Sequence, residues 1–194
     1  MEYFNLPNNP QDPEAGTRPV PFTREIYVDE SDFAEVPPPK FFRLKPEGEV
    51  RLMGAYIIKC GEIVKDAEGN VIEIHATADL ETGNGNPVDG RKIKGTIHWL
   101  SAKYAVDTTL MLYDRLFTIE NVNAIPEDKT YNDYLNPNSL TKVTTAKVEP
   151  ALADATPGDK FQFVRNGYFC KDTKNENTFN RIVGLKDSFP AKKN

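Results

Sequence analysis

Few residues of this chain have the types and spacings that catalysis requires. His75 and His98 are its only histidines, and neither is accompanied by an H-E-x-x-H spacing or a set of carboxylate ligands. No G-x-S-x-G turn surrounds a serine, so serine hydrolysis is not supported. Because enzymes need a nucleophile with a base, an acid and base pair, or a metal, we expect neither a catalytic site nor a metal site here.

The glycine and cysteine patterns also favour structural explanations. Segment 83–90 is rich in glycine, but it lacks the G-K-[ST] of a phosphate loop, and a strand pattern rather than a helix follows it. We therefore predict a flexible hairpin tip. Cys60 and Cys170 do not lie in a C-x-x-C or Cys/His ligand spacing, so we expect two reduced, half-buried thiols in a cytosolic protein.

Residues suited to nucleic-acid recognition are more prominent. Lys40-Phe-Phe-Arg43 and Phe161-Gln-Phe-Val-Arg165 interleave aromatic rings with arginine, lysine or glutamine. Arginine offers five donors in a fixed fork, glutamine offers a donor and an acceptor, and flat rings can stack on bases. Burial statistics alone assign such phenylalanines to a core and such cations to solvated strands. The formal net charge of −5 opposes phosphate binding, yet cations are concentrated within residues 40–51 and 91–94.

The elements that would hold these residues are short strands. A glycine at position 69 suits the tight loop of a hairpin, and residues 31–35 predict one helical turn before three prolines stop it. No long stretch keeps a 3.6-residue apolar period, so we predict an all-β protein with few short helices. The expected strands are residues 25–29, 40–44, 49–53, 55–65, 70–77, 92–100, 108–119, 141–148, 160–165, 167–171 and 178–185.

The chain is long enough for one sizeable core or two small ones. Five prolines within residues 1–22 predict an extended lead-in, because proline can continue neither a helix nor a central strand. The longest apolar runs are far below the roughly 20 residues that cross a bilayer, and the first residues lack the features of a signal peptide. We therefore expect a cytoplasmic location and no membrane partner.

Six ordered segments resemble the C-terminal anticodon-binding region of bacterial glutaminyl-tRNA synthetases. The resemblance extends over nearly the whole chain from about residue 17, and it rests on residues 22–29, 40–44, 49–52, 89–99, 112–117 and 160–170. It implies two β-barrels with exchanged N-terminal strands, a ribosomal-protein-like architecture. We expect a lead-in at 1–23, a barrel of the distal type at 24–104 and one of the proximal type at 105–194.

The same resemblance implies binding of the anticodon stem-loop of glutamine tRNA, without DNA as a partner. In the family, a separate catalytic domain of the same polypeptide uses ATP and glutamine. Its signatures, similar to H-I-G-H and K-M-S-K-S, do not occur in this sequence. The resemblance therefore implies no cofactor for this chain itself.

Individual residues match the family's anticodon contacts. The resemblance assigns base contacts to Arg43, Arg51, Gln162, Arg165 and Lys40, and phosphate contacts are possible for Arg91, Lys92 and Lys94. Phe42 and Met53 stand where some relatives carry basic residues. Gln162 and Arg165 would point to opposite faces of a strand unless a bulge or a strand end separates them.

Three alternatives remain open from the sequence. The equivalent domain of a eukaryotic or archaeal glutamyl-tRNA synthetase has a similar β-rich C-terminus. A protein-docking β-barrel module would use the acidic surface and bind no tRNA. A hydrolase is the most distant alternative, because it needs a cleft lined by histidine or carboxylates.

Overall fold

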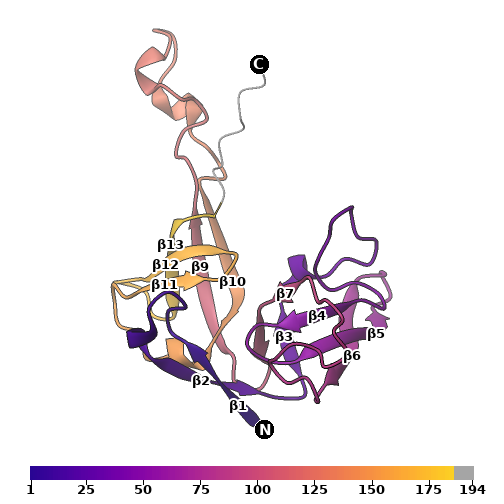
Figure 1. Ribbon diagram of the computed structural model, residues 1–194. Coiled ribbons are helices and arrows are strands. Elements are labelled where there is room, and N and C mark those ends of the chain that lie inside the picture. Colours follow the sequence, from indigo (N-terminus) through magenta and orange to yellow (C-terminus); the bar gives the residue numbers. More distant parts are fainter. Residues whose placement is uncertain (186–194) are drawn as a thin grey trace. The chain divides into compact units, whose positions relative to one another are not determined.

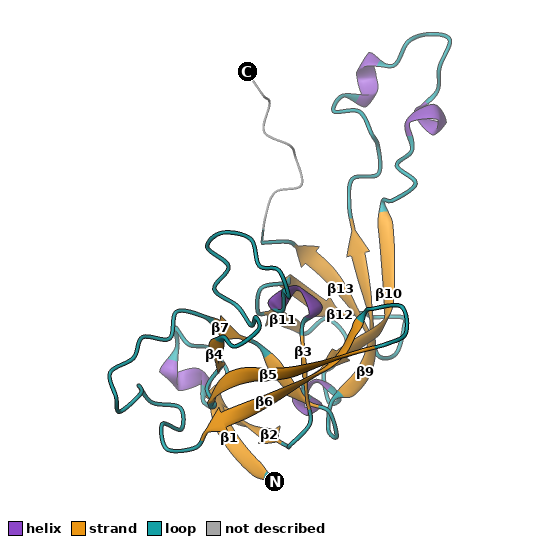
Figure 2. Cartoon of the chain, turned by 90° about the vertical axis from the view of Figure 1, so that its right-hand side faces the viewer, coloured by secondary structure: helices purple, strands orange, loops and turns teal. Residues whose placement is uncertain are grey.

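The computed structural model describes residues 1–185, and its contacts divide the chain into two compact units, Met1–Ala105 and Val106 onward (Figure 1). Both units consist of strands, short 3-10 helices and loops (Figure 2). No helix within residues 1–185 is both long and apolar enough to span a membrane. The predicted all-β class is confirmed.

The first unit contains one four-stranded sheet and two pairs of strands. The sheet has the order β6-β5-β4-β7, in which β7 runs parallel to β4 and the other pairs are antiparallel. β1 pairs with β2, and β3 with β8. The elements are β1 (Glu2–Pro7), η1 (Pro13–Ala15), β2 (Thr17–Phe22), β3 (Ile26–Val28), η2 (Glu30–Asp32), β4 (Glu49–Leu52), β5 (Ile57–Lys65), β6 (Val71–Asp79), β7 (Thr96–Ile97) and β8 (Trp99–Ser101).

The second unit is one five-stranded sheet of order β10-β9-β13-β12-β11. Between β9 and β10, residues 114–139 project beyond the sheet and are held together by an antiparallel bridge between Phe117 and Leu135 (Figure 1). The elements are β9 (Val106–Tyr113), η3 (Val122–Ala124), η4 (Tyr131–Tyr134), β10 (Leu140–Val148), η5 (Pro150–Leu152), β11 (Lys160–Phe163), β12 (Gly167–Lys171) and β13 (Thr178–Val183).

The barrel part of the prediction needs correction, because the sheets do not close. Within residues 1–185, no pairing joins β6 to β7 or β10 to β11, the edge strands of the two large sheets. A barrel requires every strand to pair on both sides. β7 has only two residues and β11 only four, so each offers a short edge. Each described pair also joins strands of one unit, so the pairings do not show exchanged N-terminal strands.

The N-terminal residues form a hairpin rather than the expected extended lead-in. β1 and β2 are antiparallel, with Asn5 opposite Pro19 and Tyr3 opposite Pro21. Pro7 lies opposite Thr17. The three prolines at positions 7, 19 and 21 therefore lie in every second residue pair of the ladder. In an antiparallel ladder, alternate pairs exchange no hydrogen bonds, and proline is tolerated there because it has no N–H to donate.

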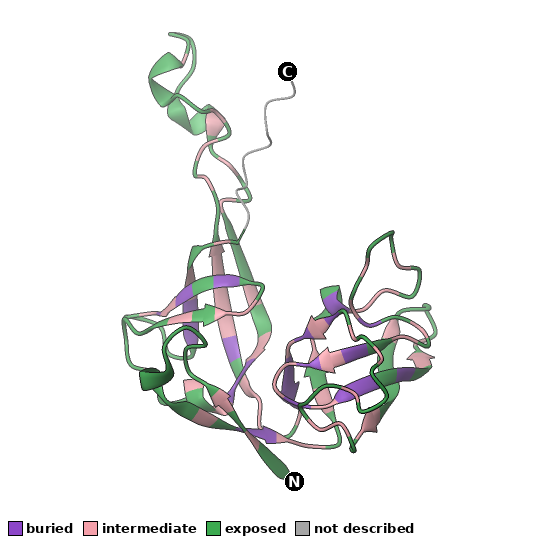
Figure 3. Ribbon diagram, viewed as in Figure 1, coloured by how far each residue is buried: buried purple, intermediate pink, exposed green. Residues whose placement is uncertain are grey.

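Apolar residues from all three sheets of the first unit meet in one core. Figure 3 marks the buried residues along the chain. Val50 and Leu52 are fully buried on one face of β4, and Trp99 donates its indole N–H to the Met53 carbonyl at 3.0 Å. The Phe22 ring meets Trp99 edge-on at 5.1 Å. The hairpin therefore belongs to this core, and its packing fixes β4 and the segments beside it.

Several predicted strands are confirmed, one is wrong and one is regular only in part. β5 and β6 form the expected hairpin, with Gly69 at φ +87°, and β10, β12 and β13 lie where expected. Residues 40–44 are not a strand, because Lys40 turns the chain at φ +63° and only Leu44 makes a bridge. The expected strand 92–100 is regular only at β7 and β8.

Candidate nucleic-acid interface

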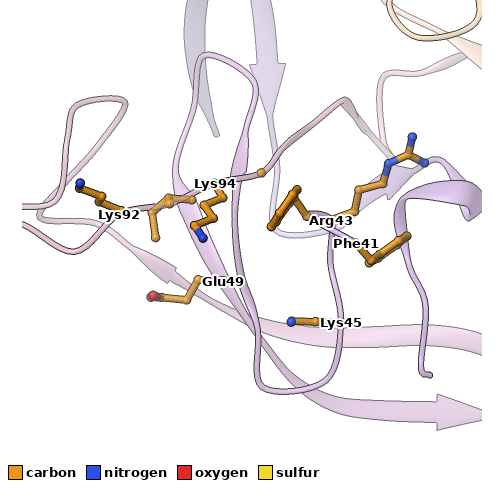
Figure 4. A pocket seen from close by; sticks show the side chains of 9 residues that line it. Phe41, Arg43, Lys45, Glu49, Lys92 and Lys94 are labelled. Atoms are coloured by element: carbon orange, nitrogen blue, oxygen red, sulfur yellow. The ribbon is translucent and has the colours of Figure 1, made fainter. Parts of the chain in front are cut away.

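A basic recess opens on the first unit where two irregular segments meet β4. Its volume is about 330 Å³, within the range of small-molecule sites. Figure 4 shows Arg43 and Phe41 from one segment, Lys92 and Lys94 from the other, and Glu49 from β4. Four cations and one carboxylate line the recess, together with two aromatic rings, namely Arg43, Lys45, Lys92, Lys94, Glu49, Phe41 and Phe42.

The segment that carries Phe41, Phe42 and Arg43 is held from both ends. At its start, the Phe41 amide donates to the Pro38 carbonyl at 3.2 Å. At its end, the Leu44 amide donates to the Asp32 carbonyl at 3.0 Å, and Leu44 bridges Phe33. Further along, the Gly48 amide donates to the Lys45 carbonyl at 2.9 Å, which closes a turn over residues 45–48. Leu44 is buried in the core, and this burial fixes the position of the more exposed residues that precede it.

Arg43 is fixed by the short helix η2. Its Nε lies 3.3 Å from a carboxylate oxygen of Asp32, whose side chain is 1% exposed. Its NH1 donates to the Ser31 carbonyl at 2.7 Å and to the Ser31 hydroxyl at 3.2 Å. The guanidinium also lies 6.0 Å from the centre of the Phe41 ring. Arg43, for which the sequence predicts a base contact, is therefore held in one orientation at the wall of the recess.

The opposite wall is formed by residues 92–95, which pass very close to the first segment. An added Cβ at Gly95 would lie 1.8 Å from the Phe42 carbonyl oxygen, so only glycine fits there. The Gly95 carbonyl accepts the Arg51 amide at 2.9 Å. Beside it, the Lys94 ammonium lies 5.5 Å above the centre of the Phe42 ring, which is 51% exposed. An exposed ring and a cation thus face solvent together.

Arg91 serves a different purpose from its neighbours. Its guanidinium reaches three carboxylates, those of Asp79 at 2.5 Å, Asp89 at 2.8 Å and Glu49 at 3.2 Å. Hydrogen bonds to Asp79 and then Asp89 raise the pKa of Arg91. Hydrogen bonds from Thr82 and then Arg91 lower the pKa of Asp79 to about 2. Arg91 therefore ties loop 79–90 to β4 and compensates the charge of Glu49, which leaves the recess net positive.

Arg51 lies beside the recess on β4. Because side chains alternate along a strand, Arg51 and Glu49 share the face opposite to the buried Val50 and Leu52. Its NH1 atom is buried, and within residues 1–185 it has no hydrogen-bond partner. Buried donors are rarely left unpaired, and each such group costs stability. The unpaired NH1 of Arg51 is a further feature of β4, next to the recess.

The structure gathers only part of the predicted set. Arg43, Lys92 and Lys94 line the recess, whereas Lys40 is exposed in the turn just before it. Gln162 and Arg165 belong to the second unit. Gln162 is exposed on β11 opposite Tyr168, and β11 ends at Phe163, so Arg165 lies in the following turn at φ +69°. This strand end removes the conflict between their expected faces.

The phenylalanines of residues 161–165 and those of residues 40–43 have different environments. The Phe163 ring stacks on the Phe169 ring with 4.4 Å between their centroids. The Phe161 ring meets the Phe179 ring edge-on, with 5.9 Å between their centroids. Phe169 and Phe179 are each 1% exposed, so the phenylalanines of the second segment belong to a core. Phe42, by contrast, is open to solvent.

Two residues of the site were missed from the sequence. Lys45 lines the recess, and the sequence contained a signal for it, since it falls within the cationic stretch 40–51. Asp32 holds Arg43, but nothing in the sequence indicates that this carboxylate is buried. Such a contact depends on the path of the chain between residues 32 and 43.

His75 and the two cysteines also have side chains that could react. His75 contacts the carboxylates of Glu62 at 3.1 Å and Glu73 at 2.8 Å, on exposed strands. Within the described chain, no group of three or more potential ligands could hold a metal. Cys60 is buried and Cys170 is half-buried, and burial raises the pKa of Cys60.

Two family models match this chain, one over residues 1–79 and the other over residues 96–172. Both are described as tRNA synthetases class I (E and Q), anti-codon binding domain. Between them they include the first segment of the recess, β4, β7 and β11.

Curated relatives agree with the family models. A glutamine–tRNA ligase of Rhodopirellula baltica is 50% identical over 97% of this chain and 32% of its own length. Those of Clostridium kluyveri and Pseudomonas putida are 47% and 45% identical over 100% and 97% of the chain. The chain spans about a third of the length of these relatives. Together with the two models, they show that the chain belongs to the family of anticodon-binding domains of class I tRNA synthetases (E and Q).

Proposed function

We propose that this chain binds the anticodon loop of glutamine tRNA as the non-catalytic part of a glutamine–tRNA ligase. The basic recess carries this proposal, because it brings a guanidinium group, lysine ammonium groups and an exposed aromatic ring together at one place. Anticodon bases are unpaired, so their edges and faces are open to hydrogen bonding and stacking. The names of the relatives support glutamine tRNA over glutamate tRNA.

Each wall of the recess would have its own task. Arg43, and Arg51 on β4, would hydrogen-bond base edges, since guanidinium groups present several donors in one plane. Phe42 would offer a face on which a base can stack. Lys92 and Lys94 would contact backbone phosphates, which position the loop without reading its sequence. In the second unit, Gln162 and Arg165 are proposed to contribute to base reading, and Lys40 to assist the first segment.

Arg91 is not part of the proposed phosphate contact. Three carboxylates already occupy its guanidinium, and a phosphate would have to displace at least one of them. We propose instead that it preserves the shape of the wall from which Lys92 and Lys94 project. Activation of glutamine with ATP is proposed for the catalytic part of such a ligase, acting in the cytoplasm.

A salt titration tests the phosphate contacts. Changing Lys92 and Lys94 together to glutamine should reduce the slope of log Kd against log salt by about 1.5, because each neutralised phosphate contributes roughly 0.7–0.9. Binding to a glutamine tRNA transcript would be measured by filter retention at several salt concentrations. The matched control changes Lys59 and Lys65, which lie on β5 outside the recess, and should leave the slope nearly unchanged. An equal slope for all three proteins would reject the assignment.

A further inference from the structure

Asp32 is an acidic residue at a site proposed to bind an anion, and this needs an explanation. Its side chain is 1% exposed and lies at the end of η2. A buried carboxylate is costly unless a cation or several donors compensate it. The Nε of Arg43, 3.3 Å away, provides such a cation. The pair therefore couples a buried group to a residue at the wall of the recess.

The backbone around Asp32 restricts where the carboxylate can lie. Its amide donates to the Asp29 carbonyl at 2.8 Å, and its carbonyl accepts the Leu44 amide at 3.0 Å. Residue 32 is thereby tied to the residue that follows Arg43. Asp32 cannot move away without disturbing both η2 and the segment of the recess.

The contacts of Arg43 use two of the three nitrogens of its guanidinium. Nε faces Asp32 and NH1 faces Ser31, so the plane of the group is determined. Arg43 lines the recess and its side chain is 35% exposed, so the fixed guanidinium is accessible from there.

We propose that Asp32 is a positioning residue, which holds Arg43 in the orientation that recognises an unpaired base. This inference rests on the proposed function. A free arginine side chain samples many rotamers and loses that freedom on binding, whereas a side chain fixed beforehand does not. Asp32 would thus raise affinity without touching the RNA.

A double-mutant cycle tests this role with a glutamine tRNA transcript as the probe. Asp32→Asn, which keeps the shape but removes the charge, should weaken binding about tenfold. In a chain that already carries Arg43→Ala, the same change should cost less than twofold, because no guanidinium remains to be positioned. Asp29→Asn is the matched control, since Asp29 caps η2 but has no contact with Arg43. It should change affinity less than twofold on either background.

Other outcomes are equally decisive. An equal loss from Asp32→Asn on both backgrounds, or no loss, would overturn the positioning role while leaving the proposed function intact. Failure of the unsubstituted chain to bind the transcript would overturn both. If thermal melting shows that Asp32→Asn does not fold, Ser31→Ala replaces it, because it removes only the 3.2 Å hydroxyl contact to Arg43. A loss of about threefold that disappears with Arg43→Ala supports the role, and a loss that persists contradicts it.

Discussion

Replacing Arg51 with methionine is expected to weaken binding of glutamine tRNA by about 1–3 kcal/mol, the cost of losing a bidentate contact to a base. Methionine keeps an unbranched apolar stem on β4 and removes only the guanidinium. Because NH1 is buried without a partner in the described residues, its loss should not lower the melting temperature. Calorimetric titration and thermal melting of the same samples would measure both quantities.

The matched control for Arg51 is Arg24→Met. Arg24 is an exposed arginine of the same unit and does not line the recess. It carries the same charge, so its loss reports the general electrostatic effect. Equal affinities of the two variants would show that Arg51 acts only through its charge, which would contradict the assigned base contact.

Replacing Gly95 with alanine should destabilise the first unit by about 3 kcal/mol, at the upper end of the usual cost of overpacking. The added Cβ would lie 1.8 Å from the Phe42 carbonyl oxygen and 2.8 Å from its carbon. Both are backbone atoms, so no rotamer change relieves the clash. Separation of the two segments would also widen the recess, and tRNA affinity should fall with stability.

Denaturant unfolding would measure this effect, with Gly85→Ala as the control. Gly85 lies in loop 79–90, where an added Cβ would be 3.3 Å from the Thr82 carbonyl oxygen. That contact is only slightly short, and we expect a change below about 1 kcal/mol. A stability of Gly95→Ala within that margin would mean that the two segments do not approach as closely as described.

Local patterns in the sequence predicted much of the fold. The β5 and β6 hairpin could be found because alternation and the Gly69 turn are both contained in one short stretch. β10 and β12 were recognisable for similar reasons, since their apolar and polar residues follow a strand pattern. Contacts between neighbours along the chain are thus sufficient to define these elements.

Long-range contacts explain most of what the sequence did not reveal. Residues 40–44 have the composition of a strand, but Gly95 brings another segment against Phe42 and no ladder forms. The prolines of the first residues suggested no regular element, because their tolerance in β1 and β2 depends on which pairs they occupy. Closure of the sheets likewise depends on edges that composition does not specify.

The candidate site shows the same division. Resemblance and residue type indicated Arg43, Lys92 and Lys94, which the fold brings to one recess. The same reasoning could not separate Arg91 from the neighbouring lysines, because its carboxylate partners are distributed over three parts of the sequence. The role of Asp32 could not be predicted either, because its partner Arg43 is eleven residues away in the sequence.

Discrimination between anticodons tests the central claim most directly. The 194-residue chain would be titrated with a glutamine tRNA transcript and with the same transcript carrying three substituted anticodon bases. Both RNAs have equal charge and length, so phosphate contacts contribute equally. The account predicts at least tenfold weaker binding of the substituted transcript, since each lost base contact costs about 1–3 kcal/mol. Equal affinity for the two RNAs would contradict it.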